Sequence, residues 1–310
     1  MKKLISIVTP TFNEEKNIEN LSKEISVQMQ NLEYDYEHII IDNASTDDTQ
    51  KIIKKLCLED KRIKAIINTK NFGHIRSPYH AILQSKGDAT ILLASDFQDP
   101  IILIPQLINK WSQGLEVVFL KRIKSQENIF LKFLKNLFYK IIGLISETRL
   151  IEKTTGSGIF SKRIVQELRK IDEPYPYFRG LVTEITDNID IIEFDQPIRA
   201  YGKSKNNFLT LYDIGILGVI KHSKLPLRLI TITGFVFSIL AFAAGIFFFI
   251  YKILFWESFQ LGLAPIILGL FFGISFQILL LGIIGEYVGF ILTQVRKLPL
   301  VIERERINFE

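Results

Sequence analysis

Two long apolar runs in the last third of the chain restrict its fold more than any other feature. Residues 229–251 contain no charged side chain, and residues 261–292 contain only Glu286. Each run is long enough to cross about 30 Å of hydrocarbon as a helix. The short linker between them, residues 252–260, carries aromatic side chains suited to a membrane interface. We therefore predict a hairpin of two transmembrane helices at residues 229–292.

Basic residues flank this hairpin on both sides. Lys221, Lys224 and Arg228 precede it, and Arg296 and Lys297 follow it. By the positive-inside rule, both ends of the hairpin then face the cytosol. The amino terminus has neither the apolar core nor the cleavage site of a signal peptide, so the front of the chain is expected in the cytosol too. The predicted location is the inner (cytoplasmic) membrane, in a multi-pass protein with both termini cytosolic.

Composition and charge exclude several classes of protein. Of the 310 residues, 48% are hydrophobic, and the formal net charge is +5. Such a modest positive balance does not indicate a nucleic-acid partner. Beside membrane segments, basic residues are expected to face anionic lipid headgroups or a pyrophosphate. The single cysteine, Cys57, excludes an intramolecular disulfide.

The first 120 residues or so alternate short apolar runs with helical patterns, for example at residues 18–29 and 49–58. This alternation predicts a mainly parallel sheet in a three-layer α/β arrangement. Three of the runs end in polar loops: residues 4–8 lead into 10–15, residues 38–41 into 42–48, and residues 89–94 into 96–100. Ligand sites of open α/β sheets lie at the carboxyl ends of the strands, so we expect one site built from these three loops.

The third loop, Asp96-Phe97-Gln98-Asp99-Pro100, indicates the chemistry of this site. Its oxygen ligands suit Mg²⁺ or Mn²⁺, which usually bind through one or two side chains plus substrate phosphates. Asp96 and Gln98 are the candidate metal ligands. A short acidic patch alone would be only a solvated turn; the two other polar loops favour a site.

A second group of segments is expected to lie on the membrane. Residues 128–146 present a wide apolar face with interspersed lysines, which predicts a helix in the membrane interface. The alternative is a core helix with one wet face. A similar semi-apolar stretch leads into the hairpin, and residues 206–228 are therefore interpreted as a juxtamembrane amphipathic segment.

Together these motifs resemble the inverting glycosyltransferases of family 2, which have the GT-A fold. Within that family the resemblance is to the polyprenyl-phosphate glycosyltransferases, such as dolichol-phosphate mannose synthase and the bacterial bactoprenol glucosyltransferases. The matching stretches are residues 8–15, 42–49, 71–73, 96–100, 199–205 and 285–289. The resemblance implies a cytosolic GT-A catalytic domain at residues 1–205, followed by the juxtamembrane segment, the hairpin and a cytosolic tail at residues 293–310.

The resemblance also implies roles for individual residues. Asp42 would accept a hydrogen bond from the base or ribose. Apart from the resemblance, Asp99 is a candidate for positioning or for accepting a proton. Arg199, Ser204 and Lys205 would form a loop that clamps phosphates, with Arg199 and Lys205 as catalytic residues. The residues implied to bind the nucleotide-sugar are Pro10, Thr11, Phe12, Asn13, Glu14, Asp42, Ser45, Asp47, Asn71, Asp96 and Ser204.

Some of these roles have plain structural alternatives. Asp47 and Asp48 could instead cap the helix that follows them. Arg199 and Lys205 could be ordinary surface charges.

The chain departs from the family pattern at two places. The family often has an acidic residue two positions before the metal aspartate, where this chain has Ala94. Many bactoprenol enzymes also carry a Gly-Asp-Phe-Arg motif, whereas residues 155–160 here contain neither the acid nor the arginine. Arg179 or Glu184 could take over part of that role.

The predicted function is inverting transfer of a sugar from a nucleotide-diphosphate sugar to polyprenyl (undecaprenyl) phosphate at the cytosolic membrane face. A phosphate acceptor is already ionised near neutral pH, so it needs no strong general base. Two alternatives are a membrane glycosyltransferase that extends a glycan or a lipid-linked sugar, and a non-enzymatic membrane partner that binds nucleotide-sugar. By family precedent, a homo-oligomer is expected.

Overall fold

The computed structural model describes residues 2–123, 154–197, 225–255 and 263–309. The chain divides into two compact units, one formed by residues 1–218 together with 297–310, and the other by residues 219–296. The predicted interfacial helix at residues 128–146 lies outside the described residues, as does most of the juxtamembrane segment.

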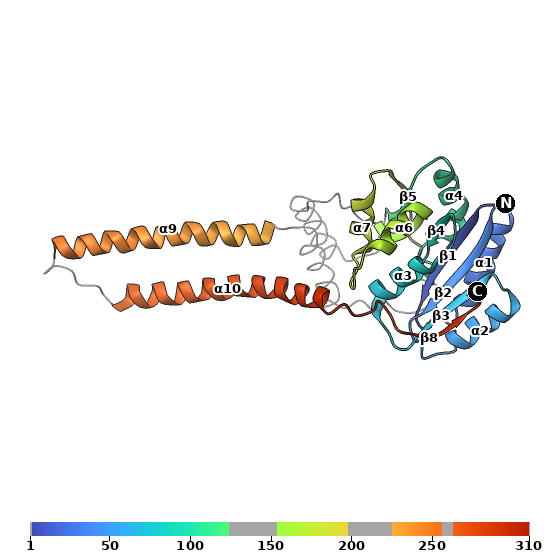
Figure 1. Cartoon of the computed structure of the whole chain (residues 1–310), viewed down its shortest axis with the longest axis horizontal. Helices are drawn as coiled ribbons and strands as arrows, with labels where there is room; N and C mark the ends of the chain where they lie inside the picture. The colour runs from blue at the N-terminus through green and yellow to red at the C-terminus, as the bar shows by residue number, and fades with distance from the viewer. Residues whose placement is uncertain (1, 124–153, 198–224, 256–262, 310) are drawn as a thin grey trace. The chain divides into compact units, whose positions relative to one another are not determined.

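Eight strands of the described residues form one sheet in the first unit (Figure 1). Their order across the sheet is β7-β5-β6-β4-β1-β2-β3-β8. Only β6 and β8 run antiparallel to their neighbours, and the others are parallel. The strands are β1 (Leu4–Thr11), β2 (Asp35–Asp42), β3 (Ile63–Asn68), β4 (Ala89–Leu92), β5 (Val117–Arg122), β6 (Thr154–Ser161), β7 (Ile189–Phe194) and β8 (Glu303–Ile307). The mainly parallel sheet confirms the predicted fold class.

Helices cover both faces of this sheet (Figure 1). Those that pack on one face are α1 (Ile18–Gln30), α2 (Thr49–Glu59) and α4 (Ile104–Ser112), the last preceded by the short 3-10 helix η1 (Ile101–Leu103). Those that pack on the other face are α3 (Gly73–Gln84), α6 (Lys162–Lys170) and α7 (Phe178–Ile185). The helices predicted from apolar spacing at residues 18–29 and 49–58 correspond to α1 and α2.

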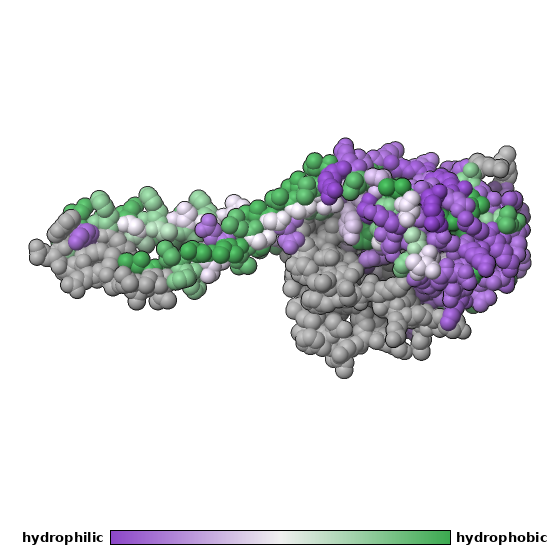
Figure 2. Space-filling view, turned by 90° about the horizontal axis from the view of Figure 1, so that it is seen from below, coloured by the Kyte–Doolittle hydropathy of each residue, from purple (hydrophilic) through white to green (hydrophobic). Residues whose placement is uncertain are grey.

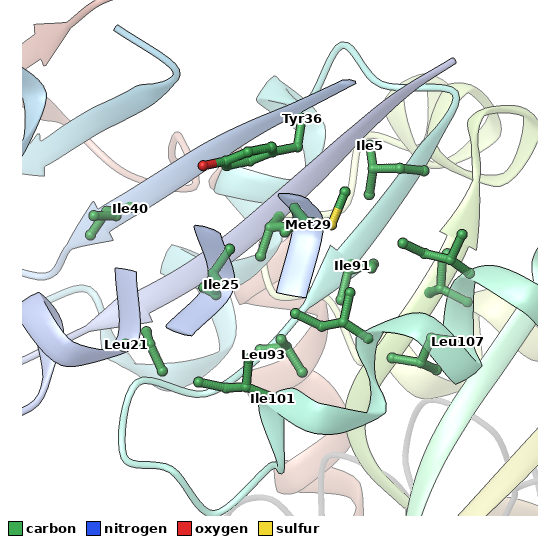
Figure 3. Packing of buried hydrophobic residues seen from close by; sticks show 14 of the residues in the cluster. Ile5, Leu21, Ile25, Met29, Tyr36, Ile40, Ile91, Leu93, Ile101 and Leu107 are labelled. Carbon is green, nitrogen blue, oxygen red and sulfur yellow. The ribbon is translucent and has the colours of Figure 1, made fainter. Parts of the chain in front are cut away.

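The core forms because successive strand residues point to opposite faces of the sheet. Leu21, Ile25 and Met29 recur at helical spacing on α1 and are buried. Figure 3 shows them beside Ile5 of β1 and Ile91 of β4, which are also fully buried. The strand residues that alternate with these point to the other face of the sheet. Those of β1 and β2 pack on the side covered by α3, α6 and α7.

The segment that departs from the family motif lies in β6, between β4 and β5. A Cβ atom added to Gly158 would lie 2.1 Å from the carbonyl oxygen of Val118 on β5. Such a distance is far too short for any side chain, so this position requires glycine. The backbones of the two strands therefore approach closely at this point.

The last strand, β8, covers the edge of the sheet formed by β3. It pairs antiparallel with β3, with Ala65 opposite Ile307 and Ile66 opposite Arg306. Its sequence, Glu303-Arg304-Glu305-Arg306-Ile307, is mostly charged, which discourages a further strand from pairing with the new edge. This strand lies within residues 293–310, which the sequence analysis predicted only as a tail, without a strand.

The second unit contains two long apolar helices, α9 (Leu225–Leu254) and α10 (Leu263–Val295). They contact each other, for example through the rings of Phe237 and Phe276, whose centroids lie 4.8 Å apart. Large apolar side chains are exposed along both, and Figure 2 shows them in green. By length and composition, both helices could cross a membrane.

Candidate active site

The carboxyl ends of the parallel strands meet at one edge of the sheet. The loops that follow β1, β2, β3 and β4 there are residues 12–17, 43–48, 69–72 and 93–100. These include the three polar loops singled out in the sequence. The amino end of the antiparallel strand β6 reaches the same edge, because Leu92 of β4 pairs with Gly158.

The loops after β1 and β2 are locked together by hydrogen bonds in both directions. The backbone N–H of Asn13 donates to Ser45 Oγ at 2.8 Å, and the N–H of Thr46 donates to Asn13 Oδ1 at 2.8 Å. The N–H of Glu14 donates to Thr49 Oγ1 at 2.9 Å. Residues 10–15 and 42–48 thus form one continuous surface, which we call the loop wall.

Asp42 is a buried part of the loop wall and organises it. The residue has no exposed surface. Its Oδ2 accepts from the Ser45 N–H at 3.0 Å and from Gln50 Nε2 at 2.7 Å, and its Oδ1 accepts from the Ser45 hydroxyl. Direct contact between this carboxylate and a nucleotide stays a prediction.

Asp47 supports the start of α2. Its Oδ1 accepts from the backbone N–H of Thr49 at 3.1 Å and from the Thr49 hydroxyl at 2.5 Å. Asp48, at the N-cap position, makes no capping bond through its side chain. Of the two aspartates considered as helix caps, Asp47 is therefore the one that holds the helix terminus in place.

The other residues predicted to bind nucleotide at the first loop differ in exposure. Pro10 and Thr11 are the last residues of β1, and Thr11 is buried. Phe12 and Glu14 are half-buried. The Glu14 carboxylate accepts from Asn17 Nδ2 at 2.5 Å.

An asparagine network joins the loop after β3 to the loop wall. Asn43 Nδ2 donates to Asn71 Oδ1 at 2.8 Å, and Asn43 Oδ1 accepts from the Phe72 N–H at 2.9 Å and from Asn68 Nδ2 at 3.1 Å. Asn71 was predicted from the sequence, whereas Asn43 and Asn68 were not. The available signal was their position, since each is a polar residue at the end of an apolar strand.

The loop after β4 carries the candidate metal ligands. Asp96 is 7% exposed, and its Oδ1 accepts from the backbone N–H of Gln98 at 3.1 Å. No group of three or more His, Cys, Asp or Glu side chains suited to a metal occurs among the described residues. One carboxylate and one amide oxygen still fit Mg²⁺ or Mn²⁺ if a diphosphate supplies further ligands.

Asp99 is buried beside Arg122 and Ser157, and we call these three residues the acid pocket. Asp99 is 1% exposed, and its Oδ2 accepts from the Ser157 hydroxyl at 2.5 Å and from the Ala94 N–H at 3.3 Å. Burial raises the pKa of Asp99, and these bonds and the charge of Arg122 offset this only partly. Arg122 Nη2 lies 3.9 Å from Asp99 Oδ1. Sequence reasoning missed both Arg122 and Ser157.

Each of the three polar loops contains a non-glycine residue in the left-handed backbone region. These are Asn13 with φ of 57°, Ala44 with φ of 62° and Phe97 with φ of 59°. Such conformations are uncommon outside glycine, and they are concentrated at functional sites. This observation marks the same edge of the sheet independently of any side-chain chemistry.

Three predicted residues, Arg199, Ser204 and Lys205, lie outside the described residues. Arg179, considered as a substitute for the missing motif, donates from Nη1 to the Thr154 carbonyl at 2.7 Å. It therefore contacts the start of β6, at the edge of the sheet where the loops gather.

Comparison with known proteins decides the family. Residues 6–179 match the family model described as glycosyl transferase family 2. The chain belongs to this family. It is thus a glycosyltransferase with the GT-A fold, as predicted from the sequence motifs.

Similar proteins match the chain over nearly its whole length. A putative glycosyltransferase, CsbB, from Bacillus subtilis is 30% identical over 302 residues, which cover 97% of this chain and 92% of that protein. The prophage bactoprenol glucosyl transferase homolog of Escherichia coli is 29% identical over 296 residues, which cover 95% of this chain and 96% of that protein.

Among solved structures, one similar protein is glucosyl-3-phosphoglycerate synthase from Mycobacterium tuberculosis in complex with Mn²⁺, uridine-diphosphate and phosphoglyceric acid. It is 17% identical with a TM-score of 0.48, over 70% of this chain and 76% of that chain.

Proposed function

We propose that the protein transfers one sugar from a nucleoside-diphosphate sugar to a polyprenyl phosphate, with inversion at the anomeric carbon, at the cytosolic face of the membrane. One observation supports this most strongly. The same chain combines a family 2 catalytic sheet with two exposed apolar helices long enough to span a bilayer. It is also similar along 95% of its length to a protein named as a bactoprenol glucosyl transferase homolog.

The loop wall is the proposed surface for the nucleotide. Asn13 and Ser45 fix its two loops to each other, and Asn71 extends it through the asparagine network. A surface that is already hydrogen-bonded within itself loses little conformational freedom when a ligand binds. Arg199, Ser204 and Lys205 are proposed to close over the diphosphate.

Asp96 and Gln98 are proposed to hold Mg²⁺ or Mn²⁺. A divalent ion bound there would offset the negative charge on the leaving diphosphate. Ala94 stands where the family pattern often has an acidic residue, so the phosphate oxygens of the donor would supply a larger share of the ligands.

The reaction is a single displacement. A phosphate oxygen of the acceptor forms a bond to the anomeric carbon, and the bond from that carbon to the diphosphate oxygen breaks. The attacking oxygen is already ionised, so no proton has to be removed from it. Asp99 is buried and bonded to Ser157, which suits a positioning residue better than a base.

A direct test uses membranes that contain the full-length protein. They are incubated with Mn²⁺, short-chain polyprenyl phosphate and a panel of nucleotide-sugars, and the lipid products are identified by mass. Asp96→Ala is expected to lower transfer by roughly a hundredfold or more, the scale seen when one key electrostatic group is removed.

The matched control is Asp35→Ala. Asp35 is an exposed carboxylate at the opposite end of the sheet, at the start of β2, and its loss should leave transfer unchanged. Full activity of Asp96→Ala would refute the metal role. Absence of any glycolipid product from the whole panel would refute the proposed reaction.

A further inference from the structure

The last strand of the chain is connected to the loop wall by four consecutive hydrogen bonds. Arg304 Nη2 on β8 donates to Gln50 Oε1 on α2 at 2.5 Å, and Gln50 Nε2 donates to Asp42 Oδ2 at 2.7 Å. The Ser45 hydroxyl donates to Asp42 Oδ1 and accepts from the Asn13 N–H at 2.8 Å. We call this series the β8 relay. It links the end of the chain to the loop after the first strand.

The chemistry of the groups fixes the direction of every bond in the β8 relay. A guanidinium can only donate, and a carboxylate can only accept. Gln50 lies between the two, so only one orientation of its amide satisfies both, with the oxygen toward Arg304 and the nitrogen toward Asp42. The opposite orientation would place the amide oxygen against the carboxylate. Gln50 Nε2 also donates to the Ser45 carbonyl at 3.1 Å, so Asp42 and Ser45 require the same orientation, and Arg304 reinforces it from the other side.

Attachment of β8 to the sheet does not depend on Arg304. The strand is paired with β3, and Thr69 donates from its backbone N–H to the Ile302 carbonyl at 2.9 Å. Asn308 Nδ2 donates to the carbonyls of Cys57 and Ile63, both at 2.8 Å. Replacement of Arg304 should thus leave the strand in place.

A second contact joins the same helix and strand without reaching the loop wall. Lys54, one helical turn after Gln50, forms an ion pair with Glu305 at 2.6 Å, and both side chains are well exposed. This neighbouring pair provides a matched control for the β8 relay.

We propose that Gln50 and Arg304 are positioning residues for the nucleotide. They keep Asp42 and Ser45 in the arrangement that fixes Asn13 in its left-handed conformation, and so give the loop wall its shape. The inference rests on the proposed function, in which the loop wall binds the nucleoside part of the donor. The end of the chain, which follows the second apolar helix directly, would then help to set the affinity of the enzyme for its donor.

The test measures binding to purified full-length protein in detergent, with MnCl₂ present. UDP and GDP are titrated separately, together with inorganic pyrophosphate, and the tighter of the two nucleotides is used throughout. Arg304→Ala and Gln50→Met are expected to weaken nucleotide binding roughly five- to tenfold, the effect of losing about one hydrogen bond. Pyrophosphate, which has no nucleoside to touch the loop wall, should bind equally to all variants.

Controls separate this role from a general structural one. Lys54→Ala and Glu305→Ala should alter nucleotide affinity by less than about twofold, as expected for an exposed ion pair. Arg304→Lys, which retains a donor, should recover most of the affinity. In an Asp42→Ala background, Gln50→Met should cause a smaller loss than in the wild type, because the two residues act largely through one contact, and Gln50 keeps its bond to the Ser45 carbonyl.

Failure of the inference and failure of the proposed function give different results. If Asp42→Ala weakens nucleotide binding but Arg304→Ala and Gln50→Met behave like the control pair, the β8 relay is wrong. A parallel loss of pyrophosphate affinity would likewise overturn it. If the wild-type protein binds neither nucleotide, or Asp42→Ala binds as wild type does, the loop wall is not the nucleotide site. Should Arg304→Ala fail to fold, Gln50→Met interrupts the relay without altering β8 and decides the question.

Discussion

The loop wall and the acid pocket lie at the same edge of the sheet, but they differ in how fully their polar groups are partnered. In the loop wall and its asparagine network, one buried atom, Asn68 Oδ1, has no hydrogen-bond partner among the described residues. In the acid pocket, both members of a charged pair have such an atom, Asp99 Oδ1 and Arg122 Nε.

This difference separates two tasks of the site. An unpartnered buried atom is more costly on a charged group than on a neutral one. The buried polar groups of the loop wall are therefore almost all hydrogen-bonded within the protein, and its shape is preorganised before a ligand binds. Within the described residues, the acid pocket keeps unused hydrogen-bonding capacity on both of its charged side chains.

The strongest test of this contrast is Asp99→Ala. The change removes the acceptor of the Ser157 hydroxyl and the Ala94 N–H, and it takes away the negative charge beside Arg122. We expect the free energy of unfolding to fall by about 2–3 kcal/mol, together with loss of sugar transfer. Thermal unfolding of the purified protein in detergent measures the first effect. Asp99→Asn keeps an acceptor and should lose less; equal stability of Asp99→Ala and wild type would contradict the described packing.

A smaller loss of stability is expected when the asparagine network of the loop wall is changed. Asn43 is 7% exposed and joins four neighbours through its amide, so Asn43→Ala should lower the free energy of unfolding by about 1–2 kcal/mol. Because the Phe72 N–H loses its acceptor, its hydrogen exchange should accelerate. Asn31→Ala, at an exposed asparagine after α1, is the control. Unchanged exchange at Phe72 would show that the network does not fix this loop.

The smallest effect is expected at Ala44, whose φ of 62° lies in the region that glycine adopts without steric cost. The left-handed conformation costs alanine about 1–2 kcal/mol, and glycine loses about 0.5–1 kcal/mol through the greater freedom of its unfolded chain. Ala44→Gly should therefore stabilise the protein by about 0.5 kcal/mol. A slightly higher unfolding temperature is the expected result. A lower temperature would indicate that the Ala44 methyl group contributes packing that outweighs the relief of backbone strain.

The parts of the fold that could be predicted are those with local patterns. Apolar spacing on α1 and α2, and short apolar runs at β3 and β4, each identify an element from a few neighbouring residues. Polar loops after three apolar runs then place the site at one edge. Strand β8 escaped prediction because its charged sequence carries no apolar pattern, and its partner β3 is remote in the chain.

The site was predictable to a similar degree. Asn13, Ser45, Asn71 and Asp96 stand in motifs with family counterparts, so their sequence context identifies them. Arg122 does not, because a basic residue at the end of a strand is indistinguishable from a surface charge until Asp99 lies beside it. Its neighbour in space comes from another loop, and only the folded sheet brings the two together.

Pairing of β8 with β3 also dictates an order of events during biosynthesis. The hydrogen bond from Thr69 to the Ile302 carbonyl cannot form until Ile302, 233 positions later in the polypeptide, has been synthesised. Both apolar helices are translated in between. Early segments of a nascent chain can fold while translation continues, yet this sheet lacks β8 until residues 303–307 have been synthesised. A product whose synthesis ended within the two apolar helices would therefore lack the strand that covers the β3 edge of the sheet.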